Sequence, residues 1–147
     1  MARRYVAVCG ASEATESQLA AAKEVGRLLA EAGAVIINGG LGGVSTAASE
    51  GASAAGGVVV GILPDAHRAG ANQWLTVALP TGMGQARNVL IVTAAQSVIA
   101  IGGGWGTLSE IAIAKRLGRP VVTLDSWPIS GLESVATPAE AVRMALG

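Results

Sequence analysis

The 147-residue chain has little charge and few aromatic side chains. Charged residues make up 14% of it, against roughly 25% in an average soluble domain. Ten basic and ten acidic side chains cancel, so no long-range field favours nucleic acid or an anionic membrane. Because the chain has three Trp, one Tyr and no Phe, its core must be built from Val, Ile, Leu and Ala. That composition suits a buried parallel sheet.

Cysteine and long apolar runs are also scarce. Cys9 is the only cysteine, which excludes an intrachain disulfide and a cysteine-based zinc site, and we expect no bound metal. No segment approaches the ~20 apolar residues of a membrane helix, and the apolar run that begins at Tyr5 is too short for a signal peptide. We therefore expect a soluble, cytoplasmic protein with no nucleic-acid or membrane partner.

Short apolar runs alternate with helical stretches along the whole chain, which is typical of βαβ units around a parallel sheet. The strands that we predict are Tyr5–Cys9, Val35–Asn38, Val58–Leu63, Leu75–Leu79, Val98–Ile101 and Val121–Leu124. The predicted helices lie near Glu16–Ala32, Val44–Ala54, Gly84–Ala95, Leu108–Leu117 and Pro138–Leu146. These elements indicate a single Rossmann-like α/β domain over residues 1–147, a doubly wound parallel sheet in three layers with strand order 3-2-1-4-5-6.

The stretch Ser97–Glu110 is the most informative part of the chain. An apolar strand runs into the glycine-rich turn Gly102–Gly106 and then into a helix, for which we predict Thr107 as the N-cap. Glycines let backbone N–H groups come close to a ligand, and the positive end of a helix favours an anion, most often a phosphate. The pattern therefore predicts a binding site for a phosphorylated small molecule.

A second strand, within Val35–Gly43, leads into a similar glycine loop. In such sheets ligands bind beyond the carboxyl ends of the strands, and both loops lie at that edge. The alternative is that the glycines only permit tight turns. The first strand is followed by Cys9–Ser12 and not by G-x-G-x-x-G, and the chain has no P-loop motif G-x-x-x-x-G-K-[ST]. We therefore expect neither a nicotinamide dehydrogenase nor a P-loop NTPase. The ligand-binding residues that we predict are Gly10, Ser12, Gly39, Gly40, Gly42, Gly43, Arg87, Gly103, Gly104, Gly106 and Thr107.

Arg87 and Glu110 are the candidate catalytic residues. Arg87 falls in the first turns of a predicted helix, where a cation opposes the helix dipole. Such a placement calls for an anion, either a ligand phosphate or Glu110; the alternative is a solvated surface arginine. Glu110 forms Thr-x-x-Glu with Thr107, the pattern of a capping box. Otherwise its carboxylate points into the pocket and binds a ribose hydroxyl or acts as a general acid or base.

Three other residues have open interpretations. Cys9 ends the first strand and is interpreted as core packing, because small buried thiols are common in cores. Trp105 lies within the glycine-rich turn, where its indole either stacks on a planar ligand ring or packs against a neighbouring subunit. His67 lies in Pro64–Trp74, the longest irregular stretch and a candidate flap, where a lone histidine is usually solvated.

The residues Gly102–Glu110 resemble the P-G-G-x-G-T-x-x-E motif of the LOG-like superfamily. That group includes cytokinin-activating phosphoribohydrolases, proteins once labelled lysine decarboxylases, and molybdenum-cofactor carrier proteins. Arg87-Asn88 matches the position of the family's Arg-Lys pair, and Asn38–Gly43 matches its second glycine loop. In the hydrolase branch the Arg and the final Glu are the working residues, which implies Arg87 and Glu110 here.

Two departures from the family pattern bear on function. Gly102 stands in place of the motif's proline, and Asn88 in place of the lysine. The Arg-Asn pair and the short chain look more like the molybdenum-cofactor carrier branch. A decarboxylase needs a lysine to hold pyridoxal phosphate, but Lys23 and Lys115 fall within predicted helices away from the loop edge.

Three functions remain open, with the molybdenum cofactor or a nucleoside monophosphate as the candidate ligand. The first is a carrier-like protein that binds a phosphorylated pterin or nucleotide, such as the molybdenum cofactor. The second is a phosphoribohydrolase that cleaves the N-glycosidic bond of a nucleoside 5'-monophosphate, and the third is a nucleotide sensor without chemistry.

The helix Gly84–Ala95 is apolar nearly all round and must be covered on more than one side. Since the resemblance also implies oligomers, we predict a homodimer or homotetramer.

Overall fold

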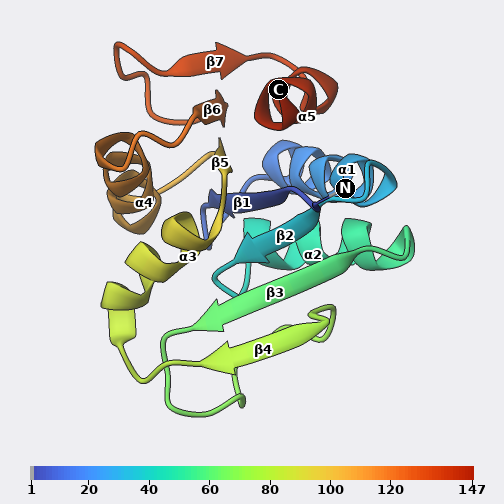
Figure 1. Ribbon diagram of the computed structural model, residues 1–147, viewed down its shortest axis with the longest axis vertical. Coiled ribbons are helices and arrows are strands. Elements are labelled where there is room, and N and C mark those ends of the chain that lie inside the picture. Colours follow the sequence, from blue (N-terminus) through green and yellow to red (C-terminus); the bar gives the residue numbers. More distant parts are fainter. Residues whose placement is uncertain (1) are drawn as a thin grey trace.

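The computed structural model describes residues 2–147, which form a seven-stranded parallel sheet between two layers of helices (Figure 1). The strands are β1 (Tyr5–Gly10), β2 (Val35–Asn38), β3 (Val58–Leu63), β4 (Val77–Pro80), β5 (Ser97–Ile101), β6 (Val121–Leu124) and β7 (Glu133–Val135). The helices are α1 (Glu16–Glu31), α2 (Val44–Ala54), the 3-10 helix η1 (Gly84–Arg87), α3 (Asn88–Ala94), α4 (Trp105–Arg116) and α5 (Pro138–Leu146). The strand order is β4-β3-β2-β1-β5-β6-β7.

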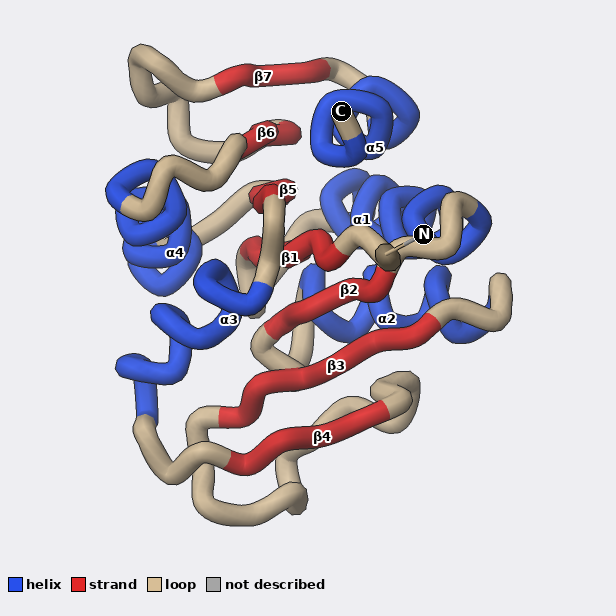
Figure 2. The backbone as a smooth tube through the Cα atoms, in the orientation of Figure 1, coloured by secondary structure: helices blue, strands red, loops and turns tan. Residues whose placement is uncertain are grey.

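Successive residues of the central strands face two separate apolar cores. Val6 and Val8 of β1 belong to the core beneath α1, α2 and α5, whereas Ala7 and Cys9 belong to the core beneath α3 and α4. Figure 2 shows these helices on the two sides of the sheet. Parallel strands that are buried on both faces need apolar residues at every position, which explains the continuous runs of Val, Ile and Ala in the central strands. The predicted Rossmann-like, three-layer α/β fold is confirmed.

The predicted strand order is wrong at one point. The fourth strand was expected beside β1, but β4 pairs with β3 at the sheet edge and β5 takes the place beside β1. The physical reason is burial: β4 alternates between exposed and half-buried residues, as an edge strand does, whereas every residue of β5 is buried. The order therefore reverses between β1 and β5, and in such sheets ligands bind near the reversal.

Several element boundaries also differ from expectation. The predicted helix Gly84–Ala95 divides into the 3-10 helix η1 and the short helix α3, and the strand predicted over Leu75–Leu79 begins later, at Val77. The three-residue strand β7 has no apolar run to signal it and was missed. Gly33, Gly56 and Gly118, each two residues after the end of α1, α2 or α4, adopt positive φ, which other residues rarely adopt.

The outer face of α3 carries exposed apolar side chains. Val89 and Leu90 are 44% and 38% exposed. The prediction of a homodimer or homotetramer rested on the apolar character of this helix, with which the exposed side chains agree. The oligomeric state itself stays a prediction. Within residues 2–147, no helix combines the length and the hydrophobicity that crossing a membrane requires, and no group of three or more His, Cys, Asp or Glu is placed to hold a metal ion.

Helices α1 and α2 touch backbone to backbone through a pair of glycines. A Cβ at Gly26 would lie 2.0 Å from the carbonyl oxygen of Ala48, and one at Gly51 would lie 1.9 Å from that of Lys23. We expect Gly26→Ala to lower the free energy of unfolding by about 2 kcal/mol, because the two helices must move apart. Urea unfolding measures this. Gly106→Ala is the matched control, since a Cβ there meets nothing within 4 Å; an equal loss in both variants would contradict the prediction.

Candidate ligand-binding site

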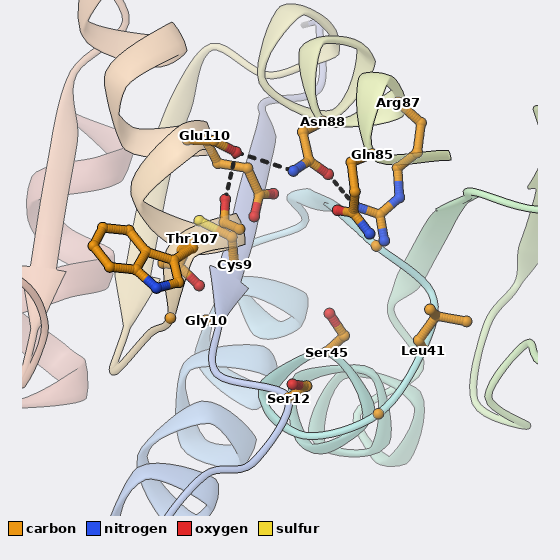
Figure 3. A pocket seen from close by; sticks show the side chains of 16 residues that line it. Cys9, Gly10, Ser12, Leu41, Ser45, Gln85, Arg87, Asn88, Thr107 and Glu110 are labelled. Carbon is orange, nitrogen blue, oxygen red and sulfur yellow. Dashed lines mark hydrogen bonds between the residues drawn. The ribbon is translucent and has the colours of Figure 1, made fainter. Parts of the chain in front are cut away.

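A cavity of about 700 Å³ opens at the carboxyl ends of the central strands (Figure 3). Its walls come from the end of β1, the loop between β2 and α2, the segment η1–α3, and the start of α4. The residues that line it are Cys9, Gly10, Ser12, Gly39, Leu41, Gly42, Ser45, Gln85, Arg87, Asn88, Gly104, Trp105, Gly106, Thr107, Ser109 and Glu110. The volume is in the range of ordinary small-molecule sites.

The loop after β2 is fixed by a buried side chain. Asn38 accepts a hydrogen bond from the backbone N–H of Gly40 at 2.8 Å, and its amide donates to the hydroxyl of Ser49 at 2.9 Å. Gly43 then begins α2 with φ 64°, and a Cβ there would lie 2.2 Å from the carbonyl oxygen of Ala11. Only glycine fits this position. The loop is thus held rigidly against the end of β1.

The loop after β5 begins its helix earlier than expected. The N-cap of α4 is Gly104, and Thr107 lies inside the first turn, so the predictions of Thr107 as N-cap and of a capping box with Glu110 are wrong. The physical reason is that Gly102 and Gly103, with φ 60° and 135°, already turn the chain. A proline could not adopt the φ of Gly102, so this backbone requires a residue other than the family's proline at this point.

The helices α2 and α4, which begin at the two glycine loops, lack side-chain caps. No side chain caps the N-terminus of α2 or of α4. By contrast, Thr15 and Thr137 cap α1 and α5, which begin outside the cavity lining. Ser45 of α2 and Trp105–Thr107 of α4 bring both first turns to the cavity wall, although the N–H of Val44 donates to the carbonyl oxygen of Ala11. The positive ends of the two helices favour a negatively charged group there.

Arg87 is buried rather than solvated, being 8% exposed. Its Nη1 donates to Oδ1 of Asn88, whose Nδ2 donates to the hydroxyl of Ser109 at 3.1 Å. The guanidinium lies over the first glycine loop, because a Cβ at Gly39 would be 3.0 Å from Nη2. Its Nε is buried and has no hydrogen-bond partner. Burial lowers the pKa of Arg87, which the carboxylate of Glu110 opposes.

Glu110 lies across the cavity from Arg87 (Figure 3). It is 7% exposed, and burial raises the pKa of its carboxyl to about 7, against the opposing effect of Arg87. Among residues 2–147 no ion pair joins Glu110 to Arg87, and the carboxylate takes part in no side-chain hydrogen bond. A carboxyl group that ionises near neutral pH is suited to proton transfer.

Nine of the predicted site residues line the cavity: Gly10, Ser12, Gly39, Gly42, Arg87, Gly104, Gly106, Thr107 and Glu110. Gly40, Gly43 and Gly103 do not line it, and all three have positive φ in the turns that shape it. Cys9, interpreted as packing, is buried but also lines the cavity; burial and the neighbouring Glu110 raise the pKa of its thiol.

Sequence reasoning missed five lining residues: Leu41, Ser45, Gln85, Asn88 and Ser109. Asn88 and Ser109 fall inside the motifs already singled out, so their positions were the available signal. Leu41, Ser45 and Gln85 carry no chemical pattern that sets them apart. The exposed His67 lies outside the lining.

The family model described as the SLOG cluster4 family matches residues 3–144. The chain belongs to the SLOG cluster4 family. A relative in Archaeoglobus fulgidus, an uncharacterised protein, is 45% identical over 139 residues, covering 94% of this chain and 91% of the relative.

Two solved structures are similar to this SLOG cluster4 chain over nearly its whole length. The molybdenum cofactor binding protein of Rippkaea orientalis is 32% identical with a TM-score of 0.92, covering 97% of this chain and 95% of that one. The molybdenum cofactor carrier protein of Chlamydomonas reinhardtii is 29% identical with a TM-score of 0.86, at the same two coverages. The predicted resemblance to the LOG-like superfamily and its carrier branch is confirmed.

A more distant structure shares the fold of this SLOG cluster4 chain. The DNA processing protein A of Streptococcus pneumoniae is 19% identical with a TM-score of 0.78, covering 96% of this chain and 61% of that one. At that identity the likeness concerns the fold alone.

Proposed function

We propose that this protein binds the molybdenum cofactor, or a phosphorylated pterin of the same type, in the cavity between its two glycine loops. The observation that carries the proposal is the convergence of three features on one cavity. These are the uncapped N-termini of α2 and α4 and the buried guanidinium of Arg87. The two solved carrier and binding proteins, which share the fold over nearly the whole chain, support the choice of ligand.

The chemistry of the cavity suits such a ligand. The guanidinium of Arg87 and the backbone N–H groups of both loops, apart from those of Gly40 and Gly102, which donate within the protein, offer donors to a phosphate. A phosphate accepts from several donors at once. Arg87 has further donors available, because within residues 2–147 its only hydrogen bond is the one from Nη1 to Asn88, and Nη2 makes none. Gly39 and Gly42 keep side chains away from the space that a phosphate would occupy. Arg87 would orient the phosphate, and the rigid loops would exclude bulk water from it.

The test uses the cofactor itself. Purified protein is mixed with molybdenum cofactor released from a molybdenum enzyme and separated from unbound cofactor by gel filtration under nitrogen. The cofactor retained is then measured by its power to reactivate a cofactor-free molybdenum enzyme. We expect retention that is lost in Arg87→Ala and kept in Arg119→Ala, an arginine outside the cavity. No retention by the wild-type protein would refute the proposal.

A second candidate function, phosphoribohydrolase activity on a nucleoside 5'-monophosphate, is favoured by Glu110. Its carboxyl lies in the same cavity as Arg87, is buried, and has a pKa of about 7. In that reaction water would add to the sugar carbon while the base leaves with a proton, and Glu110 would supply or accept protons. The replacement of the family's lysine by Asn88 speaks against it.

Incubation with nucleoside 5'-monophosphates separates the candidates. Release of free base that stops in Glu110→Ala would establish the hydrolase. Tight binding of a nucleotide without turnover, lost in Arg87→Ala, would favour a nucleotide sensor. We expect no release of base, measured by chromatography of the reaction products.

A further inference from the structure

Trp105 presents a large apolar surface at the cavity. It is the first residue of α4, lines the cavity, and is 78% exposed, more than any other exposed large hydrophobic side chain in residues 2–147. An indole left this open to water gains little from burial in the protein. Its position at a cavity with spare polar donors suggests that a ligand covers it.

A second indole supports Trp105 from outside the cavity lining. The rings of Trp105 and Trp127 lie 5.4 Å apart between centroids, tilted by 41°, a favourable aromatic arrangement. Trp127 also donates from Nε1 to the carbonyl oxygen of Gly104 at 3.2 Å. The hydroxyl of the preceding Ser126 donates to the carbonyl oxygen of Gly102. The segment after β6 therefore fixes both the glycine turn and the indole beside it.

The cavity has chemically different sides. Arg87 and Gln85 lie on one side of it, whereas Thr107 and Glu110 of α4 lie on the other (Figure 3). Trp105 begins the same helix as Thr107 and Glu110. A guanidinium donates paired hydrogen bonds to a phosphate, whereas an indole, which carries no charge, recognises a planar ring by stacking. A ligand that has both groups can satisfy both sides.

We propose that Trp105 stacks on the planar fused ring of the ligand while Arg87 holds its phosphate. This inference rests on the proposed binding of a phosphorylated pterin and adds the residue that selects for the ring. Without Trp105 the loops and Arg87 would accept any phosphate ester of suitable size. With it, the site selects a planar nitrogen heterocycle joined to a phosphate.

The test compares probes with and without a ring. Molybdenum cofactor and GMP carry fused rings, and ribose 5-phosphate carries none. We expect Trp105→Ala to weaken the binding of whichever ring probe the wild type binds by about tenfold, as one aromatic stacking contact would, and to leave ribose 5-phosphate unchanged. Trp105→Phe should keep most of the affinity, and Trp74→Phe, outside the cavity, should keep all of it. Isothermal titration calorimetry measures the affinities.

A spectroscopic readout separates stacking from a structural effect. In Trp74→Phe the only remaining indoles are Trp105 and Trp127, and a ring probe should quench their fluorescence, whereas ribose 5-phosphate should not. If Trp105→Ala binds ring probes as tightly as wild type while Arg87→Ala does not, the stacking role is refuted and the proposed function stands. An equal loss for ring and ringless probes also refutes stacking. A wild-type protein that binds no probe refutes both proposals.

Discussion

Replacing Arg87 with alanine is expected to weaken the binding of the phosphorylated ligand about a hundredfold or more, the cost of removing one partner of a buried charged contact. The reason is geometric. The guanidinium is 8% exposed, lies over Gly39, and is held by Asn88, so it is already oriented before a ligand enters. Alanine removes the charge and its donors without changing the glycine loops. Calorimetric titration with the cofactor, or with a nucleoside monophosphate that binds, measures the change.

Two further variants make this result specific. Arg119 also has a buried Nε without a partner and donates to the carbonyl oxygen of Thr93, but it lies outside the cavity. Arg119→Ala should therefore bind the ligand as the wild type does. Arg87→Lys keeps the charge but loses the planar pair of donors, so an intermediate affinity is expected. An affinity unchanged in Arg87→Ala would remove the main support for the anion site.

The sequence predicted the local elements better than their arrangement. The bounds of β2, β3, β6, α2 and α5 are as expected, because each is an apolar or periodic run bounded by turn residues. The place of β4 was predicted wrongly, because strand order depends on where a crossover packs. The half-exposed pattern of β4 and the complete burial of β5 appear only after the sheet has formed.

The site shows the same division. Glycine loops and the Arg87 and Glu110 motifs are local patterns, so the sequence indicated which residues gather at the strand ends. Thr-x-x-Glu is compatible with a capping box and with a cavity wall alike. The φ angles of Gly102 and Gly103, which begin the helix three residues early, decide between them. The burial of Arg87 depends on Gly39, which is far away in the sequence, so no local pattern around Arg87 could predict that burial.

Glu110→Gln is expected to stabilise the protein at alkaline pH and to change little at acid pH. Burial raises the pKa of Glu110 from its ordinary 4.5 to about 7, so the folded state prefers the neutral form. Stability is then highest below about pH 4.5 and falls as the pH rises through about 7, where the folded protein has to ionise the group. Above pH 8 the shift corresponds to about 3 kcal/mol of lost stability, which glutamine, being neutral, does not lose.

Urea unfolding of both proteins at pH 5 and pH 8.5 measures this difference. Comparison at the same pH cancels the titration of groups that do not interact with Glu110, and Glu133→Gln, an exposed carboxylate on β7, should show no gain. Ionised Glu110 also repels the phosphate of a ligand bound in the same cavity. The ligand affinity should therefore fall between pH 6 and pH 8 by more in the wild type than in Glu110→Gln. A gain in stability that is equal at both pH values would mean that glutamine acts through packing alone. In that case the carboxyl ionises freely in the folded protein, and its use in proton transfer near neutral pH loses its basis.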